Sequence, residues 1–138
     1  MGDILTLRQL RLPVKLIVYR NDSLGFVQQE QQAAGLLDTD VQLQNPDFAK
    51  LAEAAGLLGL RAERPEEVRP KIAQAFAHDG PALVEVHTPR QELALPPTIS
   101  AKEAIGFNVF LAKAVLSGRG DEVIDLARTN LISRWLGR

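Results

Sequence analysis

The sequence LPVKLIVYRNDSLGFVQQEQ, residues 12–31, holds the pattern that decides the fold. Residues 14–19 are apolar with a single lysine, which predicts a strand covered on both faces, as in a parallel sheet. Asn21, Asp22 and Ser23 end this strand, and residues 24–34 are expected to form a polar helix. Ligands bind at the carboxyl ends of strands in parallel sheets. These three polar residues are therefore candidate ligand-facing groups.

The rest of the N-terminal part continues an alternation of helices and strands. A helix is expected over residues 2–11, and Asn45 is expected to cap a second helix that starts at Pro46 and stops at Gly56. Strands are expected over residues 58–62 and 82–87. The helix between these strands should turn four apolar side chains inward: Val68, Ile72, Ala75 and Phe76.

This alternation predicts an α/β fold with a doubly wound parallel sheet. A chain that opens on a helix carries no strand before it, so we expect the sheet to be incomplete. Residues 89–99 are expected to be extended and proline-bearing, and residues from Ser100 onward to be helical, with a break at residues 117–120. We therefore divide the chain into a sheet domain, residues 1–95, and an arm with C-terminal helices, residues 96–138.

Composition excludes several classes of function. The chain has 138 residues, a net charge of −1 and no cysteine, which argues against nucleic-acid binding and excludes thiol catalysis and thiolate metal sites. Its two histidines are far apart, so a zinc site is not expected. No stretch approaches the roughly 20 apolar residues that a membrane span needs, and the start does not resemble a secretory signal. We expect a cytoplasmic protein.

The residues at 21–23 leave two interpretations open. Asn, Asp and Ser commonly form turns, because their side chains bond to nearby backbone. Alternatively, an amide oxygen and a backbone carbonyl are hard oxygen ligands of the kind that Mg²⁺ accepts alongside substrate phosphates.

The segments YRNDSLGF (19–26) and SGRGDEVIDLARTN (117–130) carry a resemblance to a known family. They resemble the pyruvate oxidase or pyruvate dehydrogenase (quinone) group of thiamine-diphosphate-dependent enzymes. The resemblance covers essentially the whole chain, and acetolactate synthases share its early part but not its tail. It implies a thiamine diphosphate-binding domain, with Mg²⁺ bound through the side chain of Asn21 and the backbone carbonyl of Ser23. Leu24 and Gly25 would lie beside the cofactor, and Arg20 departs from the first asparagine of the family motif.

The resemblance also implies an activity, the oxidative decarboxylation of pyruvate to acetate and CO₂, with quinone as electron acceptor. Phe26 and Glu30, four residues apart on one helix face, would face the active site near flavin and substrate. From sequence alone, Phe26 would be a core residue and Glu30 a solvated one. FAD would be bound mainly by other regions, and a homo-oligomer is implied.

An opening segment of the family motif is missing from this chain. Gly2-Asp3 is followed by isoleucine, and Asp3 lies only 18 residues before Asn21. We therefore expect Met1 to lie just beyond the family's G-D-G, with the aspartate ligand, the pyrimidine domain and the flavin domain upstream. Such a C-terminal fragment should be inactive alone.

The C-terminal segment, residues 121–138, permits two interpretations. An amphipathic helix usually packs on its own domain. The resemblance implies instead a lipid-binding helix of a peripheral protein on the inner face of the cell membrane, with Trp135 as an interfacial anchor. The predicted apolar stripe consists of Val123, Ile124, Ala127, Leu131 and Trp135.

Two other functions remain open for the whole chain. It could be a non-catalytic membrane-binding or oligomerisation module on the same framework. It could also belong to another 2-keto-acid enzyme, such as an acetolactate synthase relative.

Overall fold

The computed structural model describes residues 2–90 and 100–136, with side chains up to residue 130. The chain forms two compact units. Unit 1 consists of Met1–Asn21 and Gln44–Thr88, and unit 2 of Asp22–Leu43 and Pro89–Arg138. The predicted boundary after residue 95 falls outside the described residues.

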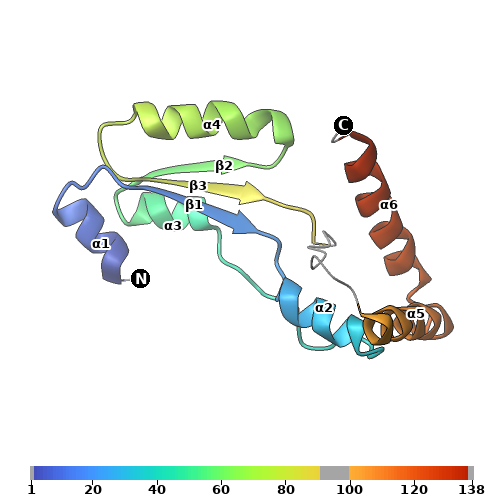
Figure 1. The fold of residues 1–138 in the computed structure, drawn as a ribbon. Coiled ribbons are helices and arrows are strands. Elements are labelled where there is room, and N and C mark those ends of the chain that lie inside the picture. The colour runs from blue at the N-terminus through green and yellow to red at the C-terminus, as the bar shows by residue number, and fades with distance from the viewer. Residues whose placement is uncertain (1, 91–99, 137–138) are drawn as a thin grey trace. The chain divides into compact units, whose positions relative to one another are not determined.

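Unit 1 is a three-stranded sheet with helices on both faces (Figure 1). All pairings are parallel and the strand order is β1-β3-β2, so β3 lies in the centre. This confirms the predicted parallel α/β fold. The elements of unit 1 are α1 (Gly2–Gln9), β1 (Lys15–Arg20), α3 (Phe48–Ala54), β2 (Leu58–Ala62), α4 (Pro65–Ala77) and β3 (Ala82–His87).

Alternation along β3 sends successive side chains to two separate cores. Val84 and Val86 pack with Leu60 of β2 and Ala75 of α4 on one face. On the other face, Leu83 packs with residues of α3 and its neighbours, including Ala52 and Leu57. Since both faces are covered, β3 is buried over almost its whole length.

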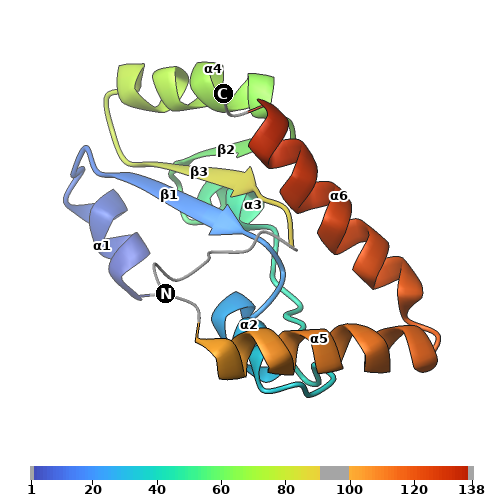
Figure 2. The ribbon, with the colours of Figure 1, turned by 45° about the vertical axis from the view of Figure 1, so that its right-hand side comes forward.

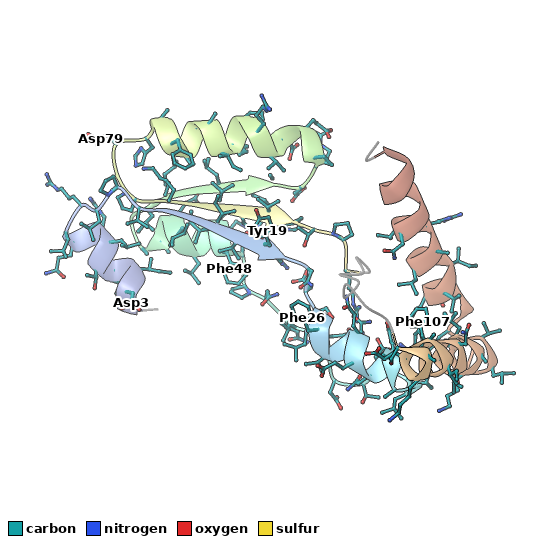
Figure 3. All side chains as sticks on the ribbon, viewed as in Figure 1. Asp3, Tyr19, Phe26, Phe48, Asp79 and Phe107 are labelled. Atoms are coloured by element: carbon teal, nitrogen blue, oxygen red, sulfur yellow. The ribbon has the colours of Figure 1, made fainter. Side chains whose placement is uncertain are left out.

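The expectation that β1 is covered on both faces is wrong for unit 1. Leu16 and Val18 pack on the α3 face, but Tyr19 is 72% exposed on the opposite one (Figure 3). The reason is position: β1 lies at the end of the sheet, and α4 packs on β2 and β3. An apolar run thus indicates a parallel sheet without showing which strand is at its edge.

Two details of the helices of unit 1 also differ from expectation. The N-cap of α3 is Asp47, not Asn45, because the Asp47 carboxylate accepts the hydrogen bond from the Lys50 backbone nitrogen at 2.9 Å. Phe76 is 67% exposed, whereas its neighbour Ala75 is buried at 1%, so the inward face of α4 stops one residue earlier. The predicted stop of α3 at Gly56 is confirmed by a left-handed φ of 80°.

Unit 2 is built from three helices, α2 (Gly25–Ala33), α5 (Ala101–Leu116) and α6 (Gly120–Leu136) (Figure 2). A capping box between Ser100 and Glu103 starts α5. The backbones of α2 and α5 approach closely at Gly106, where a Cβ would overlap the carbonyl oxygen of Ala33. Gly118 follows the end of α5 and has a left-handed φ of 77°. It lies within the predicted break at residues 117–120.

Candidate functional site

Asn21 directly follows β1, at the carboxyl edge of the sheet of unit 1. The preceding residue, Arg20, pairs in register with His87, and its carbonyl oxygen accepts a hydrogen bond from the Thr88 nitrogen at 3.0 Å. The edge where β1 and β3 end is therefore formed by backbone pairing up to the residue before Asn21. This is the position expected of a ligand-facing group in a parallel sheet.

A tight turn follows in unit 2. Asp22 has a left-handed φ of 52°, which Asp tolerates better than most residues. Its carbonyl oxygen accepts from the Leu43 nitrogen at 3.0 Å, and the Leu24 nitrogen donates to the Val41 carbonyl at 2.8 Å. These two bonds form the antiparallel bridge between Ser23 and Gln42, and neither uses the carbonyl oxygen of Ser23.

A buried chain of polar side chains runs from this turn. The Ser23 hydroxyl donates to Oε1 of Gln28 at 3.1 Å, and Nε2 of Gln28 donates to Oδ2 of Asp38 at 2.5 Å. Asp38 in turn pairs with Nη2 of Arg119 at 2.5 Å, which also contacts Glu122 at 2.6 Å. Hydrogen bonding to Glu122 raises the pKa of Arg119; burial opposes this, and Asp38 reinforces it. The sequence analysis missed this chain, because Asp38 and Arg119, which it joins directly, lie 81 residues apart.

The predicted cofactor-side residues start α2. Leu24 is the N-cap residue and provides no side-chain hydrogen bond, and Gly25 is the first helical residue. Phe26 is 76% exposed (Figure 3). Glu30 is exposed as well, so both lie on the outward face of α2 within unit 2. The core interpretation of Phe26 therefore does not hold within this unit. The inward face of the helix carries Gln28 and Gln32 instead.

A second polar cluster, also missed from sequence, surrounds Glu85 at the centre of β3. The side chain of Glu85 is completely buried, at 0% exposure. Its Oε1 accepts from Nη1 of Arg20 at 2.9 Å and lies 3.1 Å from Nε2 of His87. Its Oε2 accepts from the Ala49 nitrogen at 3.1 Å and from Nη2 of Arg61 at 3.3 Å.

The Glu85 carboxylate stays ionised although its side chain is buried. Burial alone raises the pKa of Glu85, but the hydrogen bonds from Arg20, Ala49 and His87 outweigh it and hold the pKa below its ordinary value. The Ala49 nitrogen belongs to the first turn of α3, where the helix end favours negative charge. The departure at Arg20 from the family's first asparagine thus has a structural role: Arg20 neutralises a buried carboxylate.

The donors at the predicted metal position suit a hard cation. Asn21 and Ser23 supply neutral oxygens, which suit Mg²⁺ when anionic phosphates complete its shell. Among the described residues, no group of three or more His, Cys, Asp or Glu side chains could cage a metal ion. The N-cap residue of α2, Leu24, makes no side-chain hydrogen bond, and the start of this helix carries backbone N–H groups of the kind that bind phosphate. Each of these groups, taken singly, is of a kind that binds Mg²⁺ or phosphate.

The predicted apolar stripe of α6 is only partly described. Ile124 is 56% exposed and Ala127 is exposed, Val123 is half-buried, and Leu126 is the buried residue among residues 120–130 of this helix. The side chains of Leu131 and Trp135 lie outside the described part of the chain. Within the described residues, no helix is both long enough and apolar enough to cross a membrane.

Comparisons with known proteins place these observations in a family context. The family model for the thiamine pyrophosphate enzyme, C-terminal TPP binding domain, matches residues 1–86. The Bacillus subtilis protein YdaP, described as thiamine pyrophosphate-containing, is 31% identical over 129 residues, which are 94% of this chain and 22% of YdaP.

Acetolactate synthases match a shorter part of the chain. The mitochondrial catalytic subunit of Saccharomyces cerevisiae is 39% identical over 90 residues, covering 64% of this chain and 13% of that protein. The Mycobacterium bovis acetolactate synthase is 42% identical over 81 residues, covering 54% of this chain and 13% of that protein. The chain therefore spans less than a quarter of the length of each of these curated relatives.

Proposed function

This chain belongs to the thiamine pyrophosphate enzymes, as a part of their C-terminal TPP binding domain, and we propose that it supplies half of a thiamine diphosphate–Mg²⁺ site in a 2-keto-acid enzyme. The observation that carries the proposal is the end of β1. A parallel strand ends at Arg20, and Asn21, an oxygen-rich turn and the N-terminus of α2 follow it directly.

The proposed roles follow from the chemistry of each group. The side-chain oxygen of Asn21 and the backbone carbonyl of Ser23, two residues apart in the chain, are the proposed Mg²⁺ ligands. Leu24 and Gly25 present backbone N–H groups at the start of α2 to the diphosphate. When bound, thiamine diphosphate supplies the electron sink for decarboxylation of a 2-keto acid. Phe26 and Glu30, exposed on one face of α2, contact the substrate side of the site.

The finer assignment is a pyruvate:quinone oxidoreductase that also uses FAD. Its support is the resemblance of residues 117–130 to that group. Similarity to YdaP, which covers 94% of this chain, extends further than similarity to the acetolactate synthases above, which covers 54–64%, but YdaP is described only as thiamine pyrophosphate-containing. The alternative is an acetolactate synthase relative, which the identity of 39–42% over 81–90 residues favours. We propose that the flavin, the remaining metal ligand and most of the substrate pocket come from other segments of a longer homo-oligomeric protein.

NMR spectroscopy with Mn²⁺ in place of Mg²⁺ tests the metal site. In the ¹⁵N-labelled 138-residue chain with thiamine diphosphate, Mn²⁺ should broaden the backbone signals of residues 21–25 before others. Asn21→Ala should abolish this broadening, and Asn45→Ala, which alters an asparagine of the loop before α3, should not. Strongest broadening elsewhere in the chain would contradict the proposal.

Calorimetry on the same chain tests whether other segments are needed. We expect binding of thiamine diphosphate with Mg²⁺ that is weak but detectable, because a carboxylate ligand is expected from another segment. Tight binding would show that the chain holds the cofactor unaided, and the fragment hypothesis would then be wrong.

The C-terminal helix is proposed to bind lipid from the cytoplasmic side of the cell membrane. This proposal is supported by the exposed side chains of Ile124 and Ala127 on α6. Liposome flotation of the chain with and without residues 120–138 measures this directly. Equal flotation of the two would rule out the tail as the lipid-binding element, and flotation without cofactor binding would favour the non-catalytic membrane module.

A further inference from the structure

The buried polar chain of unit 2 connects the proposed metal-binding turn to the start of the C-terminal helix. We propose that Arg119 is a positioning residue: acting through Asp38 and Gln28, it holds the turn at Ser23 in its metal-binding conformation. The effect on metal binding rests on the proposed function. The contacts of the relay themselves are hydrogen bonds and an ion pair within unit 2.

The direction of the relay follows from the hydrogen-bonding capacity of each group. An ionised Asp38 can only accept hydrogen bonds, so Gln28 must turn its amide nitrogen toward it. The amide oxygen of Gln28 is thereby left to face Ser23, whose hydroxyl donates to it at 3.1 Å. The charge of Asp38 therefore determines the orientation of Gln28, and Gln28 determines that of the Ser23 hydroxyl.

Arg119 is the cation that balances the buried Asp38 carboxylate. The Asp38 side chain is only 2% exposed, and a buried carboxylate without a cation is strongly destabilised. The guanidinium of Arg119 is suited to the task because Nη2 contacts both Asp38 and Glu122 while Nη1 lies 3.5 Å from the Asp38 carbonyl oxygen. A lysine at this position would restore the charge but not these several contacts.

A second contact fixes the same loop to the helices. Nζ of Lys113, near the end of α5, donates to the Gly35 carbonyl at 2.7 Å. Residues 35–38 are thus held by α5 and by the connection from α5 to α6, although they are about 80 residues away in sequence. Displacement of the start of α6 would therefore release Asp38 and loosen the Ser23 turn.

NMR of the metal-free chain tests the relay. Arg119→Ala and Asp38→Asn should both shift the side-chain amide signals of Gln28 and the backbone signal of Ser23. Arg119→Lys should restore these signals in part. The matched control is Arg128→Ala, which removes an exposed arginine from α6. Signals of Ser23 and Gln28 that move no more in the first two variants than in the control would overturn the inference.

The Mn²⁺ experiment separates this inference from the proposed function. If both the metal site and the relay exist, the Arg119→Ala variant should need an Mn²⁺ concentration about 10–100-fold higher to reach the same broadening. Removal of groups behind a metal ligand commonly weakens metal affinity by this much. Absence of broadening in the unaltered chain refutes the metal site, while the metal-free shifts still decide the relay. Should Arg119→Ala unfold unit 2, the isosteric Asp38→Asn variant decides the same question.

Discussion

Replacing Glu85 by glutamine should destabilise unit 1 by about 3 kcal/mol, because it removes a buried charge on which two guanidinium groups depend. The carboxylate is completely buried and accepts from Arg20 at 2.9 Å. A hydrogen bond to a charged group contributes about 1.5–3 kcal/mol. The contacts to Arg61, at 3.3–3.4 Å, are longer, and Arg61 keeps its ion pair with Asp47. The expected loss therefore lies at the low end of the 3–5 kcal/mol typical of a broken buried pair.

Urea unfolding followed by NMR measures this loss separately in each unit. Amide signals of Val84 and Val86 report on β3 of unit 1, and those of Phe110 and Ala114 report on α5 of unit 2. In the Glu85→Gln variant, the urea concentration at the midpoint of unfolding should be lower when it is measured from the Val84 and Val86 signals. Two outcomes would refute the reasoning: a loss below about 1 kcal/mol, the range of exposed ion pairs, or an equal loss in both units.

Glu66→Gln is the matched control for this experiment. The Glu66 carboxylate is exposed and lies 3.6 Å from Arg64, so it experiences the same substitution in a solvated ion pair. We expect no measurable change in the stability of unit 1. A loss as large as that of Glu85→Gln would mean that glutamine itself, and not the buried charge, causes the effect.

Three further predictions concern stability. Hydrogen bonds outweigh burial and lower the pKa of Glu85, so its contribution is present above its ordinary value of 4.5 and is lost as pH falls through the lower folded value. Urea titrations of unit 1 should show falling stability below about pH 5, with a shallower fall in Glu85→Gln; an unchanged slope would contradict this. Gly59→Ala should destabilise unit 1 by about 1–3 kcal/mol, since a Cβ there would overlap the Ala49 carbonyl. Gly106→Ala should do the same to unit 2, where a Cβ would overlap the Ala33 carbonyl. Thermal melts with unit-resolved signals measure both, and equal melting of both units in either variant would argue against a local clash. The matched controls, where a Cβ meets nothing within 4 Å, are Gly2→Ala and Gly120→Ala.

Local patterns predicted the elements of the sheet well. Apolar runs located β1, β2 and β3 within one residue, and Gly56 and the break before α6 were found from their backbone requirements. The position of Asn21 at the carboxyl edge also followed from sequence, because a polar residue after a parallel strand must lie there. Helix boundaries were less predictable, since Asn45 and Asp47 are both good caps and only the backbone conformation selects between them.

The polar clusters were not predictable, because they depend on which strand is central. Glu85 is the one acidic residue in a mostly apolar strand, and from sequence such a residue is expected at the surface. It is buried because β3 is paired on both sides and α3 covers its face. For the same reason, the apolar Tyr19 is exposed on the edge strand β1.

Sequence by itself thus determined a parallel α/β framework with Asn21 at a strand end, because strand periodicity and turn chemistry are local properties. Only the tertiary structure decided which charges are buried and what balances them. Arg20 meets Glu85, and Arg119 meets Asp38, across separations of 65 and 81 residues. Electrostatic partners at such distances are set by packing, since a buried carboxylate is stable only where the fold brings a cation to it.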